Sequence, residues 1–256
     1  MVRSHLPPDV DSYLNDLVDR IEAILGDRLI GLYLHGSAVQ SDFQPGRSDI
    51  DVLGLVSGKL NDPDREHLTD SLSHKSLPVP ARGLEFLLCT AESARNPVFA
   101  FPYEYALSTG VEWGTVWEPS GCSSDTLIHA LVCQQSGGAL FGPPPEQVFG
   151  PISRVLLQKA LIAELEWHIR ELPNQTDPLL PANAILNAAR SVYASQTGHI
   201  ASKTEGARLW LKDHPSDQLV LAALSFRRGE GQFAPKKTEI TKFIKRAIVS
   251  VERVGV

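Results

Sequence analysis

The sequence lacks the long apolar runs of membrane proteins and the cysteine patterns of secreted or zinc-binding proteins. No stretch approaches the roughly 20 apolar residues that a membrane helix needs. No apolar run follows the basic Arg3, as it would in a secretory signal. The three cysteines, Cys89, Cys122 and Cys133, cannot all pair within one chain and show no metal-ligand spacing. We therefore expect a protein of the reducing cytoplasm that makes no membrane contact.

The chain also lacks an excess of positive charge. Its 24 Lys and Arg residues stand against 30 Asp and Glu residues, and the formal net charge is −6. This balance argues against a nonspecific nucleic-acid binder and suits a small cationic substrate. No His-Glu-x-x-His pattern occurs, which disfavours a zinc enzyme. With 256 residues, of which 43% are hydrophobic, the chain can bury the core of one large domain or two modest ones.

The first half alternates helical and strand-like patterns. Short apolar runs without helical periodicity predict strands over Leu29–His35, Ile50–Val56 and Gly83–Cys89. Helical spacing predicts one helix that includes Leu14 to Leu25 and another over 63–76, and a short helix is expected to start at Ala38. Alternating helices and strands indicate an α/β layer.

The second half has no strand-like alternation. Breaks at Pro173, Gly198, Pro215 and Gly229 separate helical patterns. We expect a helical bundle in which the helices span 152–169, 182–197, 203–212, 218–228 and 238–254. The proline-rich stretch at 142–145 indicates a boundary between domains at 1–149 and 150–256.

The densest chemical signal is Gly36-Ser37, followed after eleven residues by Asp49-Ile50-Asp51 at the start of a strand. Alternate residues of a strand share a face, so Asp49 and Asp51 project to the same side. Two neighbouring carboxylates repel one another unless a cation lies between them, and their oxygens suit Mg²⁺. Gly36 would let a phosphate approach the backbone, and the Ser37 hydroxyl could donate to it.

Glu85 is a third acid, in another apolar strand. If that strand neighbours the aspartate strand, the three carboxylates form a cluster that could hold a metal and accept a proton from an attacking hydroxyl. An isolated Asp-x-Asp is more often a solvated loop or strand-end pair. The combination of the turn, the strand pair and the third acid favours the metal site.

These motifs resemble the nucleotidyltransferase superfamily, and more specifically the aminoglycoside (3'')(9) adenylyltransferases. The resemblance extends in order through both halves. It comprises Leu34–Val39, Ser48–Leu53, Leu84-Glu85 and Gly110–Trp113, then Asn183–Arg190, Tyr193, Thr197–Lys203 and Trp210. It implies a mixed-sheet nucleotidyltransferase domain followed by a helical domain, with transfer of AMP from ATP to a hydroxyl and release of pyrophosphate.

The resemblance also implies roles for individual residues. Asp49, Asp51 and Glu85 would bind Mg²⁺, and Glu85 would be the base. The ATP contacts would be Gly36, Ser37, Ser48, Arg190 and Lys203, and the drug contacts Glu112, Trp113 and Asp177. The alternatives are a helix-surface position for Arg190, a solvated loop position for Lys203 and core packing for Trp113.

The acceptor expected from the resemblance is spectinomycin, streptomycin or both. Glu171-Leu172 stand where the family's streptomycin-specific tryptophan is expected, which makes spectinomycin the better supported substrate. Two alternatives stay open: another hydroxyl acceptor, such as a different antibiotic or a protein side chain, and a nucleotidyltransferase-like interaction module without catalysis. We expect a monomer that binds no nucleic acid.

Overall fold

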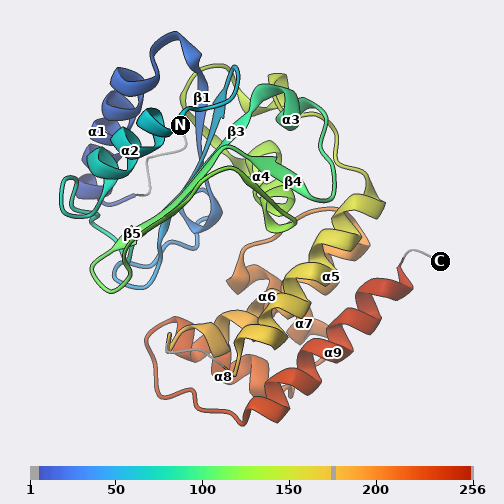
Figure 1. Ribbon diagram of the computed structural model, residues 1–256. Helices are drawn as coiled ribbons and strands as arrows, with labels where there is room; N and C mark the ends of the chain where they lie inside the picture. Colours follow the sequence, from blue (N-terminus) through green and yellow to red (C-terminus); the bar gives the residue numbers. More distant parts are fainter. Residues whose placement is uncertain (1–5, 174–176, 255–256) are drawn as a thin grey trace. The chain divides into compact units, whose positions relative to one another are not determined.

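A computed structural model describes residues 6–173 and 177–254, and the chain divides into two compact units, 1–151 and 152–256 (Figure 1). The start of the chain, where no secretory signal is expected, lies partly outside the described residues. Among the described helices, none is both long and apolar enough to cross a membrane.

The first unit is built on a six-stranded sheet in the order β6-β5-β3-β2-β1-β8. The strands β2 (Ile50–Val56) and β3 (Leu84–Thr90) pair in parallel, and every other neighbouring pair is antiparallel. The remaining strands of this sheet are β1 (Leu29–His35), β5 (Tyr105–Gly110), β6 (Gly114–Glu118) and β8 (Gly138–Phe141). The sheet is therefore mixed. A separate two-stranded sheet pairs β4 (Phe101–Tyr103) with β7 (Gly121–Ser123).

Helices cover both faces of the large sheet (Figure 1). On one face, α1 (Pro8–Leu25) and α2 (Asp62–Leu72) bury their apolar side chains against alternate strand residues that include Leu34, Val52 and Phe86. On the other face lies α4 (Asp125–Ser136), which is buried over most of its length, and the short α3 (Ala91–Arg95) follows β3. The sheet side chains that project toward α4 are thus those of the opposite parity, including the positions of Asp51 and Glu85.

Local sequence signals explain where the helices of the first unit begin. Pro8 lies in the first turn of α1, where its missing N–H costs no hydrogen bond, and Asp9 and Asp11 follow in that turn. The helix α2 starts with a capping box in which the Asn61 side chain accepts from the Asp64 backbone N–H at 2.8 Å.

The second unit is a bundle of five helices over its described residues. They are α5 (Arg154–Glu171), α6 (Leu180–Thr197), α7 (Lys203–Asp213), α8 (Gln218–Arg227) and α9 (Lys237–Arg253). The helix α6 packs against each of the others, and its many buried alanines permit close approach. A side chain at Gly206 of α7 would overlap Arg190 of α6, so this glycine allows the two helices to contact.

The expected fold class is confirmed: a mixed α/β layer precedes an all-helical part. One local expectation is wrong. The segment after β1 is a single 3₁₀ turn over Gly36–Ala38 and not a helix that starts at Ala38, because Gly36 adopts a positive φ of 66° directly after the strand.

Candidate functional site

Three carboxylates converge at the start of β2 and β3. Asp51 lies opposite Glu85 in the parallel register, and Asp49 lies two residues before Asp51 on the same side of the chain. Each of the three offers an oxygen, and these oxygens all lie within 4.8 Å of one another. Asp49 and Asp51 are half-buried, whereas Glu85 is exposed. The alternation of β3 directs its neighbours Leu84 and Phe86 into the core and leaves Glu85 exposed.

Three converging carboxylates are a donor set for a hard divalent cation. Their mutual repulsion is relieved by a metal, and Mg²⁺ completes its coordination with water and phosphate oxygens when only a few carboxylates bind it. Among the residues that the structure describes, this is the cluster of acidic, histidine and cysteine side chains with metal-binding geometry. The residues therefore fit a magnesium ion.

The Gly36-Ser37 turn lies against the acid cluster. A Cβ atom at Gly36 would overlap the Asp51 carboxylate, so only glycine lets the turn approach this closely. The Ser37 Oγ atom is buried and has no hydrogen-bond partner, which is costly unless a ligand supplies one. Ser48 is buried and its Oγ accepts from the Gln44 N–H at 3.0 Å, so it holds the loop that precedes Asp49.

Three buried titratable side chains in the first unit, those of His35, Cys89 and Cys133, are uncharged at neutral pH. Burial, followed by the nearby His129, holds the pKa of His35 well below its ordinary value, and the two rings lie 4.9 Å apart. Burial also raises the pKa of the Cys89 and Cys133 thiols. His35 is therefore neutral, and neither cysteine has the thiolate character of a nucleophile.

Trp113 lies in the turn between β5 and β6 and packs beside the start of β3. A Cβ atom at Gly83 would overlap the Trp113 ring. The guanidinium of Arg82 lies 5.3 Å from the ring centroid and its Nε lies 3.9 Å from Glu112 Oε2. Core packing alone does not describe Trp113, because its ring is only half-buried. The ring covers Gly83 and has the Arg82 guanidinium near its face.

Sequence reasoning missed Arg82. Its backbone N–H donates to Ser48 O at 3.0 Å, which joins the segments leading into β2 and β3. The available signal was its position two residues before Leu84-Glu85, where a cation would lie near the acids.

The second unit holds the remaining predicted residues. Arg190 Nη2 lies 3.7 Å from Glu164 Oε1, and its side chain is only 16% exposed, which excludes the helix-surface alternative. Lys203 is half-buried at the first position of α7, after the capping residue Ser202. Asp177 Oδ1 accepts from the Leu179 N–H at 2.8 Å, so one carboxylate oxygen is used at the start of α6.

Leu172, at the position expected for the streptomycin-specific tryptophan, is 3% exposed. It is a packed aliphatic side chain that offers no aromatic surface to a ligand.

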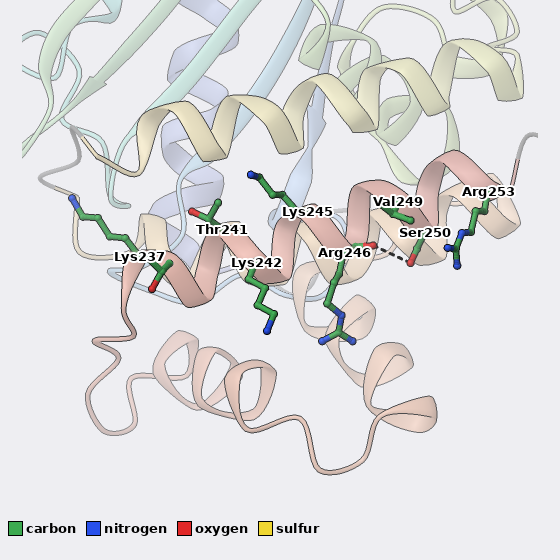
Figure 2. Close-up of a pocket in the computed structure, with 9 residues that line it drawn as sticks. Lys237, Thr241, Lys242, Lys245, Arg246, Val249, Ser250 and Arg253 are labelled. Carbon is green, nitrogen blue, oxygen red and sulfur yellow. Dashed lines mark hydrogen bonds between the residues drawn. The ribbon is translucent and has the colours of Figure 1, made fainter.

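A depression on the second unit runs along the outer face of α9 and contains none of the predicted site residues (Figure 2). It is lined by Lys237, Thr238, Thr241, Lys242, Lys245, Arg246, Val249, Ser250 and Arg253. The buried residues of α9 lie on its other face, as expected for an amphipathic helix with a solvated basic side.

Comparisons with known proteins agree with the motifs. Residues 147–249 match the family described as "Aminoglycoside adenylyltransferase, C-terminal domain". The match covers the helical unit as far as residue 249 and includes Arg190 and Lys203.

The similarity continues through the first unit. The chain is 26% identical over 255 residues to an aminoglycoside (3'') (9) adenylyltransferase from Shigella flexneri and 26% identical over 256 residues to the enzyme of the same name from Escherichia coli. In both cases 95% of each chain is covered. The resemblance read from the motifs is thus confirmed.

A solved structure shares the fold. The spectinomycin adenyltransferase AAD(9) from Enterococcus faecialis, crystallised with ATP and spectinomycin, matches with a TM-score of 0.77 and 20% sequence identity. The match covers 95% of this chain and 99% of that chain. The two proteins therefore share their fold over nearly the whole of both chains.

Proposed function

We propose that the protein transfers AMP from ATP to a hydroxyl of spectinomycin, streptomycin or both, with release of pyrophosphate, and so confers antibiotic resistance. The observation that carries this proposal is the convergence of Asp49, Asp51 and Glu85 beside the Gly36-Ser37 turn. The names of the relatives and of the matching structure support the nucleotide and the class of acceptor.

In this proposal Asp49, Asp51 and Glu85 hold Mg²⁺, which would neutralise charge that develops on the α-phosphate. Gly36 leaves room for a phosphate next to the backbone, and the unpartnered Ser37 hydroxyl donates to one of its oxygens. Ser48 supports the same site by holding the loop that leads into Asp49.

Glu85 is proposed as the general base. Of the three acids it is the exposed one, so an acceptor can reach its carboxylate. The acceptor hydroxyl forms a bond from its oxygen to the α-phosphorus, the bond to the β-phosphate breaks, and the hydroxyl proton goes to Glu85. Pyrophosphate carries away the bonding electrons as the leaving group.

Arg190 and Lys203 are proposed to bind the same triphosphate. A triphosphate needs cations beyond the metal ion, and a planar guanidinium can donate to phosphate oxygens in pairs. We propose that residues 1–149 act as the nucleotidyltransferase domain and residues 150–256 as the helical domain that supplies these cations.

The acceptor is proposed to contact Trp113, Glu112 and Asp177. An aromatic face and two carboxylates suit an aminocyclitol that carries ammonium groups. Leu172 replaces the aromatic side chain associated with streptomycin, so spectinomycin is the acceptor that the sequence supports best.

We also propose that the protein acts as a cytoplasmic monomer without nucleic acid. ATP is available in that compartment, and Cys89, Cys122 and Cys133 are free thiols in the structure. The formal charge of −6 is unfavourable for binding a polyanion.

The direct test is to incubate the purified protein with Mg²⁺, ATP and each drug and to measure adenylylated product by mass. We expect product with spectinomycin, and Glu85→Gln should lower kcat by about 10²- to 10⁴-fold, because a positioned base contributes this much. Glu66→Gln, which removes an exposed acid from α2, is the matched control and should keep the full rate.

The outcome also separates the alternatives. Modification of neither drug would refute the acceptor, and product with another hydroxyl compound would reassign it. Binding of ATP and Mg²⁺ without AMP transfer to any acceptor would favour an interaction module. Full activity of Glu85→Gln would refute the assignment of the base.

A further inference from the structure

A buried polar cluster joins α5 and α6 next to Arg190. Glu164 and His168 lie one turn apart on α5, and Asn187 and Arg190 lie one turn apart on α6, so each pair shares a helix face. The Glu164 side chain is 13% exposed and the His168 side chain 4% exposed.

The hydrogen bonds of Asn187 determine how the cluster is oriented. Its Nδ2 lies 3.0 Å from Glu164 Oε1 and 2.8 Å from His168 Nε2. A carboxylate only accepts, so the amide nitrogen must face Glu164, and Nε2 of His168 must then be the acceptor. His168 is therefore the neutral tautomer with its proton on Nδ1.

The charges around His168 agree with this assignment. Burial, followed by the nearby charges of Lys203 and Arg190, lowers the pKa of His168 to about 3. His168 therefore adds no charge at neutral pH, and the charged groups of the cluster are Glu164, Arg190 and Lys203.

The position of the Glu164 carboxylate is fixed by more than its ion pair with Arg190. Its Oε1 accepts from Asn187 and faces Arg190 Nη2 at 3.7 Å, whereas its Oε2 is buried without a hydrogen-bond partner. A buried carboxylate with one unpartnered oxygen is expensive. The carboxylate forms an ion pair with Nη2 of Arg190, and the guanidinium has further N–H donors that suit an anion.

We infer that Glu164, oriented by Asn187, is a positioning residue that holds Arg190 ready for the triphosphate. This inference rests on the proposed function, because it takes ATP as the ligand of Arg190. Ordering a long side chain before the ligand arrives reduces the entropy lost on binding. Glu164 thus aids ATP binding although its own charge repels phosphate.

The two effects of Glu164 have opposite signs, and this makes the inference testable. If Glu164 positions Arg190, Glu164→Gln weakens the binding of ATP·Mg²⁺, by about 5- to 10-fold from the ordering of one long side chain. If Glu164 only repels the nucleotide, the same variant binds ATP more tightly.

Calorimetric titration of the drug-free protein with ATP·Mg²⁺ measures this difference. The set comprises wild type, Glu164→Gln, Arg190→Gln and the double variant, with Glu166→Gln on the exposed side of α5 as the matched control. We expect Glu166→Gln to change the Kd by less than about 2-fold, and Glu164→Gln to have no further effect once Arg190 is replaced. In steady-state assays, Glu164→Gln should raise the KM for ATP and leave the KM for spectinomycin unchanged.

Unchanged or tighter ATP binding by Glu164→Gln would overturn the inference, and so would additive effects of Glu164→Gln and Arg190→Gln. If Glu164→Gln does not fold, Asn187→Leu, which removes the amide that orients Glu164, must weaken ATP binding in the same way. Wild type that binds ATP without transferring AMP would refute the proposed function alone, and the titration would still decide on Glu164. Wild type that binds no ATP would refute both.

Discussion

Gly36 lies where the turn after β1 contacts the acid cluster, and both the turn and the contact require glycine. Its φ of 66° suits glycine, and its missing side chain leaves the space that the Asp51 carboxylate occupies. Gly46 also has a positive φ, of 72°, but no atom lies near the place where its Cβ would be. A side chain at either glycine would strain the backbone, but only a side chain at Gly36 would also overlap Asp51. Comparing substitutions at the two positions therefore distinguishes the two effects.

We expect Gly36→Ala to lower AMP transfer by more than about 100-fold, since displacing a metal-binding carboxylate by a fraction of an ångström misplaces the reacting groups. Gly46→Ala should lose only about 1 kcal/mol of stability through the positive φ and should keep its activity. Adenylylation kinetics and urea unfolding of both variants test this prediction. Similar activity losses in the two variants would show that the overlap with Asp51 is unimportant.

Single residues differ in how far the sequence predicts them. Asp49 and Asp51 could be placed on one face because strand alternation is a local rule. The partner strand of Glu85 and the contact of Arg82 with Trp113 could not be predicted in this way, since both depend on which distant segments pair. The roles of these residues in catalysis and binding stay predictions.

At the scale of elements, the packing of α5 on α6 buries His168 and lowers its pKa, so that it is neutral in the folded protein at neutral pH. The unfolded chain binds a proton at His168 with a pKa of about 6.5, and the folded chain only near 3. The unfolded state therefore gains protons as the pH falls below about 6.5, and stability is lost in that direction. His35 contributes with the same sign.

We expect His168→Gln to weaken this acid dependence. Between pH 8 and pH 5 the wild type should lose about 2 kcal/mol more of its free energy of unfolding than the variant, because each pKa unit corresponds to about 1.4 kcal/mol. Urea unfolding at the two pH values measures the difference, and His67→Gln, at an exposed position of α2, is the control. An equal loss in wild type and His168→Gln would show that His168 is protonated in the folded state.

Elements with a clear hydrophobic period were predicted well. The expected strand 50–56 is β2 with the same bounds, and the expected helix 203–212 differs from α7 by one residue. The strands β4 to β8 were missed. The strands β4, β7 and β8 span only three or four residues, β6 is exposed, and four of the six residues of β5 are Ala, Ser, Thr or Gly. The helix α4 was missed because it is buried over most of its length and has no polar face.

At the scale of the whole molecule, ligand binding should raise the free energy of unfolding. A ligand that binds only the folded state stabilises it by about 2.7 kcal/mol at a concentration of 100 times Kd. If the acid cluster holds the metal under the triphosphate, ATP should stabilise the protein fully only when Mg²⁺ is present.

We expect ATP with Mg²⁺ to raise the midpoint of thermal unfolding by about 5–10 °C for a chain of this size, and ATP with EDTA to raise it much less. Asp51→Asn should remove most of the difference between the two conditions. Differential scanning fluorimetry provides the measurement. Equal stabilisation with Mg²⁺ and with EDTA would contradict metal binding by the cluster.

The location of Trp113 has a consequence for the range of acceptors, if this residue contacts the acceptor as proposed. Glu112 and Trp113 lie in the hairpin turn between β5 and β6, whereas the three acids lie on β2 and β3 or just before them. Turns tolerate replacement and insertion better than central strands do. If the proposed roles hold, substitutions in this turn would change the acceptor that is bound and would leave the carboxylate cluster unchanged.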